Sequence, residues 1–132
     1  MSCCNRCNCT LLAVIASVIV GVVAAFLQIT GTIIVTTAFL WVLFGIGVVS
    51  LGVLLLGAAR SRTDATYCLC TTVNTLLVAI LGTILFAVVL LAVGVVATSV
   101  ASAILVGLLL AFFTLLLTSG ACLVRYLYGC GS

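Results

Sequence analysis

Four long runs of apolar residues, separated by short breaks, take up nearly the whole chain. The runs cover residues 10–29, 33–59, 67–92 and 99–124. A helix needs about 20 mostly apolar residues to cross the hydrocarbon layer of a bilayer, and each run reaches that length. The pattern therefore predicts an all-α fold, a four-helix transmembrane bundle in a single membrane domain that spans residues 1–132.

The breaks between the runs carry turn and capping residues. They fall at residues 28–32, 60–66 and 94–99. Gly31 can supply a tight turn after the first run, and Thr63 or Asp64 can cap the helix that follows the middle break. Because four runs cross alternately, we expect both termini and the middle break on one side of the membrane, and the other two breaks on the opposite side.

Composition rules out a water-soluble domain. Hydrophobic residues make up 67% of the chain and charged residues only 4%, too few to cover a soluble exterior. The charged residues all fall on the expected side of the termini: Arg6, Arg60, Arg62, Asp64 and Arg125. Four scattered arginines form no basic patch, so we expect no nucleic-acid partner.

The chain lacks the usual residues of catalysis. It has no histidine, and Asp64 is its single carboxylate, so paired-carboxylate, Ser-His-Asp and His-metal mechanisms have no residues to use. We therefore expect no enzymatic activity, no cofactor and no small-molecule substrate.

Eight cysteines are the unusual reactive groups, and all are expected on the side of the termini. They are Cys3, Cys4, Cys7, Cys9, Cys68, Cys70, Cys122 and Cys130. Because lipid already enforces helical backbone bonding, a monomer has little need of eight cysteines, so we favour disulfides that cross-link copies of the chain. The alternative is a soft-metal site for Zn or Cu(I), built from thiolates in C-x-x-C and C-x-C spacing, with Cys4, Cys7, Cys9, Cys68 and Cys70 as its ligands. Acylation is a third interpretation.

The two halves of the chain carry an internal repeat. Cys7-Asn8-Cys9-Thr10 recurs as Cys68-Leu69-Cys70-Thr71, and Arg62 aligns with Arg125. The repeat predicts two tandem helical hairpins, residues 7–62 and residues 68–125, inserted in the same orientation. Such a parallel repeat disfavours the inverted-repeat layout of many transporters.

Small residues form a stripe at four-residue spacing on two of the expected helices. The stripes consist of Ala13, Ser17, Gly21 and Ala25 on the first helix, and of Ser99, Ala103, Gly107 and Ala111 on the fourth. Small residues let helix backbones approach closely, which drives association in lipid. Packing within one subunit and packing between subunits both fit the stripes.

Two amides lie near or within the spans. We expect Gln28, close to the end of the first span, to reach the lipid headgroups, and Asn74 in the third span to bond a neighbouring helix.

The order of these features resembles a known group of proteins. A cysteine-rich start with Cys7-Asn8-Cys9-Thr10, an apolar hairpin with Gln28-Ile29-Thr30-Gly31, an Arg-containing loop, Cys68-Leu69-Cys70 and a terminal cysteine are similar to those of small uncharacterised hydrophobic proteins from endospore-forming bacteria. The resemblance implies a bacterial source and a spore or envelope setting, and it carries no catalytic residues. Small mercury-resistance membrane transporters also combine few spans with cysteine pairs, but here no pair lies within a span.

These features together favour a structural role. We expect a self-assembling integral protein of a bacterial membrane, or of the spore or cell envelope, whose small-residue stripes associate and whose cysteines cross-link on one face. Its partners would be the lipid bilayer or an apolar protein assembly, and it would form a homo-oligomer or polymer. The alternative is a thiol-dependent protein that binds or transports a soft metal, and a small channel or regulatory subunit is a weaker third. The charges place the cysteine face in the cytoplasm, whereas disulfides require an oxidising compartment, so its sidedness stays open.

Overall fold

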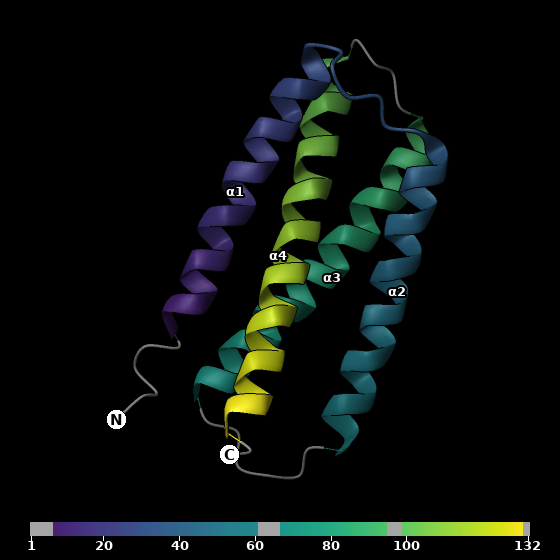
Figure 1. The fold of residues 1–132 in the computed structure, drawn as a ribbon. Helices are drawn as coiled ribbons and strands as arrows, with labels where there is room; N and C mark the ends of the chain where they lie inside the picture. Colours follow the sequence, from purple (N-terminus) through teal and green to yellow (C-terminus); the bar gives the residue numbers. More distant parts are fainter. Residues whose placement is uncertain (1–6, 61–66, 95–98, 131–132) are drawn as a thin grey trace.

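Four long helices form the fold. The computed structural model describes residues 7–60, 67–94 and 99–130. The helices are α1 (Cys7–Ile29), α2 (Thr37–Arg60), α3 (Tyr67–Val93) and α4 (Val100–Cys130), and they pack as a bundle (Figure 1). Each contains an apolar stretch of 21 to 26 residues, about 31 to 39 Å of helix, which is enough to cross a bilayer. The predicted all-α bundle of four candidate membrane spans is confirmed.

Two glycines in left-handed conformation end helices where the sequence predicts breaks. Gly31 has a φ of 70°, and the N–H groups of Thr32 and Gly31 donate to the carbonyls of Leu27 and Gln28, each over 3.1 Å. This is a Schellman motif, which satisfies two carbonyls at the end of α1. Gly94, with a φ of 79°, ends α3, and its N–H group donates to Leu90 over 3.0 Å.

The second helix begins later than the predicted residue 33. Residues 33–36 form a non-helical connection, and Thr36 caps α2 by accepting a bond from the N–H of Phe39 over 3.4 Å. Ile33, Ile34 and Val35 are β-branched and disfavour helix before a cap. Hydrophobicity alone cannot distinguish such a connection from a span, because Val35 is itself buried in the core.

The helices are arranged in space in the order α1, α4, α3, α2. Each packs chiefly on its neighbours in that order, with only slight contact between α1 and α3. Among the described residues, α1 and α2 share no extensive contact although they follow one another in sequence, and they flank the central pair (Figure 1). In this order α3 packs directly on α4, whereas α1 stands apart from α2.

The larger core residues belong to α2, α3 and α4. One cluster contains Leu40 and Leu43 of α2 with Leu90 of α3 and Leu109 of α4. A second cluster, nearer the other end of the bundle, joins Leu76, Ala79 and Ile80 of α3 to Leu116 of α4. None of the α1 residues whose side chains the structure describes belongs to either cluster, so α1 is attached by different contacts.

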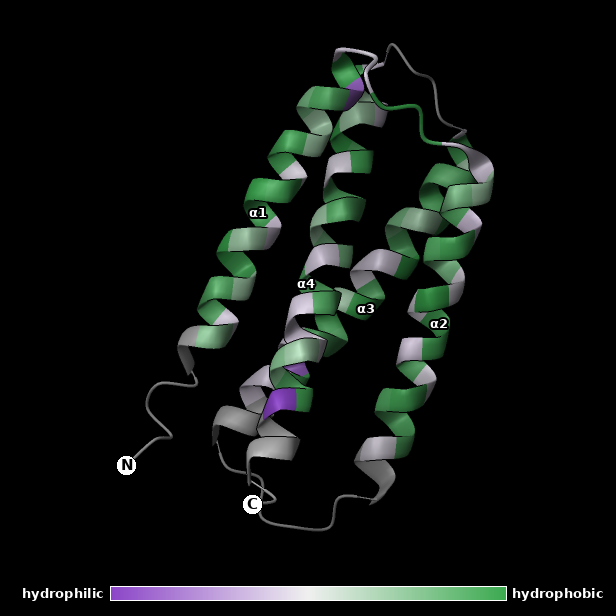
Figure 2. Cartoon of the chain, in the orientation of Figure 1, coloured by the Kyte–Doolittle hydropathy of each residue, from purple (hydrophilic) through white to green (hydrophobic). Residues whose placement is uncertain are grey.

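Hydrophobic side chains also cover the outside of the bundle. Figure 2 shows hydrophobic colour along all four helices, with the most hydrophilic colour near helix ends. Leu12, Leu56 and Ile34 are 70%, 71% and 77% exposed. An exterior of this kind suits contact with lipid, and it supports association with a bilayer.

Candidate functional site

The contact between α1 and α4 is built almost entirely from small residues. The side of α1 that faces α4 buries Ala13, Ser17, Gly21, Ala24 and Gln28. These positions are separated by four, four, three and four residues. The buried residue after Gly21 is therefore Ala24 and not the predicted Ala25, which is half-buried. The helical period of about 3.6 residues, rather than a strict spacing of four, was the signal that would have found Ala24 and Gln28. We call this contact the α1–α4 seam.

Gly21 and Gly107 bring the two backbones together at the middle of the seam. A methyl group on Gly21 would lie 2.8 Å from Cβ of Ala111 and 3.0 Å from the carbonyl oxygen of Gly107. A methyl group on Gly107 would lie 2.8 Å from both Cβ of Ala25 and the carbonyl oxygen of Gly21. Because the obstacles include backbone atoms, neither position has room for a side chain.

The two predicted stripes therefore meet within one chain. On α4, Ala103 is buried and Ala111 is half-buried, while the half-buried Ser99 lies one residue before α4 begins. The contacts of Gly21 with Ala111 and of Gly107 with Ala25 join the stripe of α1 to that of α4. The structure thus places these small residues in packing inside the subunit.

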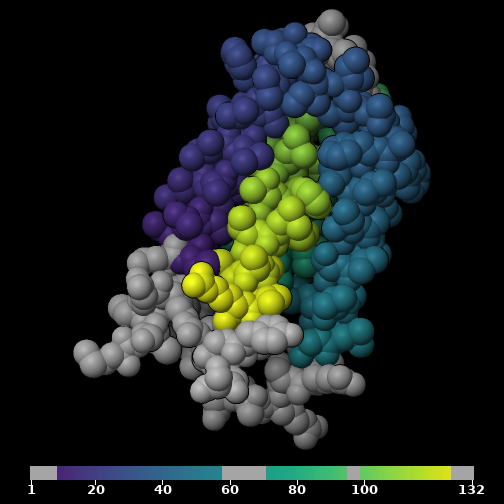
Figure 3. Space-filling model, in the orientation of Figure 1, coloured from purple at the N-terminus to yellow at the C-terminus, as the bar shows by residue number. Residues whose placement is uncertain are grey.

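One side of the seam is an open apolar groove of about 260 Å³. Its lining consists of the four small residues at the crossing and the larger side chains Val18, Val22, Ile104 and Leu108. In the space-filling view, α4 lies in a hollow between α1 and α2 (Figure 3). The side chains that line the groove at the seam are all apolar, so none of them offers a polar group for recognition of a soluble ligand.

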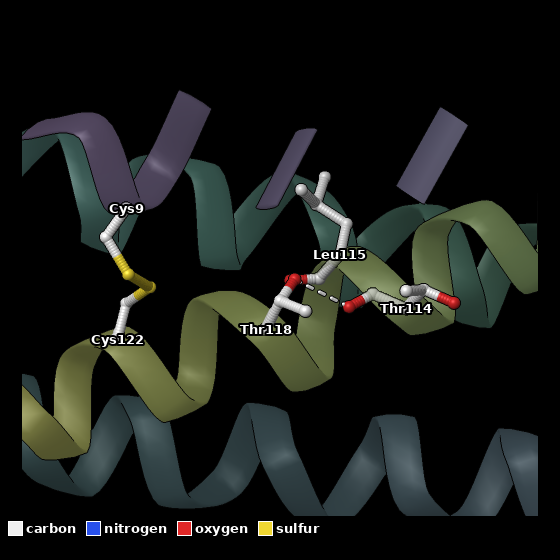
Figure 4. The surroundings of a disulfide bond; sticks show 5 residues. All are labelled: Cys9, Thr114, Leu115, Thr118 and Cys122. Atoms are coloured by element: carbon white, nitrogen blue, oxygen red, sulfur yellow. Dashed lines mark hydrogen bonds between the residues drawn. A yellow bond between two sulfur atoms is a disulfide. The ribbon is translucent and has the colours of Figure 1, made fainter. Parts of the chain in front are cut away.

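A disulfide closes the seam at one end. Cys9, in the first turn of α1, is bonded to Cys122 of α4, with the two Cα atoms 6.4 Å apart (Figure 4). The bond links residues separated by 113 positions. Sequence reasoning placed both cysteines on the same side of the membrane, but could not pair them, because eight cysteines allow 105 connectivities.

In the neighbouring turn of α4, the hydroxyl of Thr118 bonds to its own helix. The hydroxyl of Thr118 donates to the carbonyl of Thr114 over 2.7 Å and approaches that of Leu115 at 3.2 Å (Figure 4). At this end of the seam, the disulfide adds a covalent link between α1 and α4 to their side-chain packing.

The other cysteines lie outside the residues whose side chains the structure describes. Cys7, Cys68, Cys70 and Cys130 belong to α1, α3 and α4 by backbone, and Cys3 and Cys4 precede the described chain. Of the five predicted metal ligands, Cys9 is committed to the disulfide and in that state cannot be a thiolate ligand. The remaining four ligands are not placed.

Two amide predictions differ from the structure. Gln28 is only 1% exposed, and its Oε1 has no hydrogen-bond partner, so it does not reach the headgroups. The drift of the seam turns this residue inward. Asn74 is exposed on α3 and, among the described residues, bonds no neighbouring helix. Sequence alone did not reveal this exposure.

Comparison of the chain with models of protein families, with curated proteins and with solved structures finds no match in any of the three.

Proposed function

We propose that the chain is a structural, self-assembling integral protein of a bacterial membrane or of the spore or cell envelope, without enzymatic activity. In this proposal the two tandem hairpins form a unit that associates with copies of itself, and cysteines on one face cross-link the copies. The observation that carries the proposal is the disulfide between Cys9 and Cys122.

The disulfide supports the proposal through its position. It lies at the end of the bundle where α1 begins, α2 ends, α3 begins and α4 ends (Figure 1). By sequence, the other six cysteines belong to the same end. A compartment that oxidises Cys9 and Cys122 also favours oxidation of thiols beside them. Since one bond already closes the seam within a subunit, six further cysteines are in excess of what one subunit requires.

The surface of the bundle agrees with a role in an apolar layer. Large aliphatic side chains are exposed along α1 and α2, the two outer helices. In lipid, such helices associate through van der Waals contact between complementary surfaces and not through expulsion of water. A protein-dense layer held only by this packing would be labile in detergent, and covalent links on one face would make it resistant.

Electrophoresis of native material tests the proposal. Thiols are alkylated at lysis, and samples are run with and without reductant while bound metal is counted. We expect a ladder that collapses to 13.5 kDa on reduction. Changing Cys3, Cys4 and Cys7 to Ser should shorten the ladder, while the control Cys9→Ser with Cys122→Ser should leave links through the other six cysteines.

Two outcomes would contradict the proposal. Monomers without reductant would show that copies are not cross-linked. Free thiols with stoichiometric metal on Cys4, Cys7, Cys9, Cys68 and Cys70 would favour the alternative, a thiol-dependent protein for a soft metal such as Zn or Cu(I).

A further inference from the structure

Helix α1 is held to the rest of the molecule almost entirely by α4. It packs along α4, touches α3 only slightly and, within the described residues, shares no extensive contact with α2. Neither core cluster includes a residue of α1. In Figure 1, α1 lies along one side of the bundle. It is thus a peripheral element with essentially one partner surface.

Everything that recognises α1 lies on α4. Gly21 fits against Ala111, Ala25 against Gly107, and Cys9 bonds Cys122. The buried hydroxyl of Ser17 is satisfied within α1, because it donates to the carbonyl of Val14 over 2.7 Å. A second copy of α1 carries the same residues, so α4 would bind it by the same contacts.

The bilayer makes the exchange of α1 between copies inexpensive. A membrane helix keeps its backbone hydrogen bonds when it leaves a neighbour, so only side-chain packing is lost. The same packing is regained on the α4 of another copy. The Oε1 atom of Gln28 gives up no hydrogen bond, because it has no partner in the seam. Once released, this amide could reach the headgroup region, since it lies one residue from the end of α1.

The connection between α1 and α2 supplies a hinge. Gly31 and Thr32 complete the cap of α1, and Val35 is anchored in the core of the other three helices. Between these fixed points, Ile33 and Ile34 are non-helical and are 37% and 77% exposed. A change of direction at these residues would redirect α1 without disturbing either its cap or the core.

We propose that copies of this chain join by exchanging α1, so that Cys9 of one copy forms its disulfide with Cys122 of another. The partner is a second copy of the chain, and the interface is the α1–α4 seam itself. Two copies that exchange α1 with each other form a closed dimer. Copies that each place α1 on a further copy form an open polymer. The inference rests on the proposed self-assembly and identifies one of its links. In each link the two thiols lose two electrons and two protons, which reduce an external disulfide compound to two thiols.

A pair of complementary variants tests the exchange. Both lack the six other cysteines; one also carries Cys122→Ser and the other Cys9→Ser, and the two carry different tags. A bond between Cys9 and Cys122 can then form only between copies. After co-expression in one membrane and treatment with oxidised glutathione, we expect a reducible dimer that carries both tags, several-fold more abundant than either dimer with one tag.

Two further variants separate exchange from random collision. Gly107→Leu in the chain that retains Cys122 should lower the two-tag dimer several-fold, because it fills the space that α1 enters. Gly52→Leu should not, because a side chain at Gly52 meets nothing within 4 Å. The parent of both variants lacks the six other cysteines and retains Cys9 and Cys122. A shift in its electrophoretic mobility on reduction shows whether the disulfide closes within one chain.

Three results would overturn the inference. The first is a parent that closes its disulfide while the mixed variants give no two-tag dimer. The second is a two-tag dimer that is insensitive to Gly107→Leu, and the third is a parent that forms no disulfide at all. None of these would remove a native ladder built by the other six cysteines, so failure of the exchange and failure of the proposed function can be told apart.

Discussion

Hydroxyl side chains inside this bundle bond mainly to their own helices. Ser17 donates to Val14, Thr83 to Ala79 and Thr114 to Leu110, over 2.7 to 2.8 Å. Each acceptor is a carbonyl three or four residues earlier in the same helix, a bond that needs no second helix. These hydroxyls can therefore be buried in an apolar layer without deciding which helices meet. Which helices meet must therefore depend on the shape of the helix surfaces, where glycine and alanine allow close approach.

Ser119 is the exception among the buried hydroxyls. It is 1% exposed, and its Oγ has no hydrogen-bond partner. We expect Ser119→Ala to raise stability by up to about 1 kcal/mol, because it removes a buried polar atom that bonds nothing. Ser17→Ala is the matched control, since that hydroxyl is satisfied, and it should not stabilise. Thermal unfolding in detergent micelles measures both; equal melting temperatures for Ser119→Ala and the parent would contradict the argument.

At the scale of helices, the sequence carried most of the information on which elements exist, but less on where they end. Four apolar runs predicted four helices, and Gly31 predicted the turn that ends the first. Residues 33–36 were assigned to a helix because apolar content does not distinguish a β-branched connection from a span. The small residues on α1 and α4 were identifiable by spacing, whereas the choice of partner depends on how four helices fit together.

The seam makes a prediction at this scale. Gly21→Leu and Gly107→Leu should each destabilise the contact between α1 and α4 by about 1 to 3 kcal/mol, because each side chain would collide with backbone of the other helix. The expected readouts are a lower melting temperature and slower formation of the disulfide between Cys9 and Cys122 from the reduced chain. Gly52→Leu on α2, where a side chain has open space, is the control.

Unchanged disulfide formation in Gly21→Leu and Gly107→Leu would mean that Cys9 meets Cys122 without close approach of the helices. The seam would then be a loosely packed contact that only the disulfide holds together. A loss of similar size in Gly52→Leu would instead indicate a general cost of adding leucine to this bundle.

At the scale of the whole molecule, the fold gathers chemically active groups at one end. Cys9 and Cys122 lie at that end, together with the exposed Arg125 of α4, and the breaks at the opposite end contain no charged residue. Because the four spans cross the membrane alternately, the sequence predicted that the cysteines and charged residues lie at one end. The pairing of Cys9 with Cys122 was not predictable, because it depends on α1 packing on α4 instead of on α2.

Two physical rules assign this end to opposite sides of a membrane. Arginine-rich segments usually remain in the cytoplasm, and four arginines belong to this end. A disulfide persists in an oxidising compartment and is reduced in most cytoplasms. The preference of arginine-rich segments for the cytoplasm acts during membrane insertion, and in this chain it depends on few charges. The disulfide is a bond of the folded molecule, so we give it the greater weight and expect the cysteine end to face the oxidising side.

Labelling of intact cells decides between the two orientations. A thiol reagent that cannot cross membranes is applied to a variant that retains only Cys9 and Cys122, before and after treatment with a reductant that also cannot cross. We expect labelling only after reduction, because the sulfurs are bonded to each other and exposed to the outer compartment once freed. Labelling that requires permeabilised cells would place the end in the cytoplasm. The disulfide would then have to survive a reducing pool, and the proposed cross-linking would lose its chemical basis.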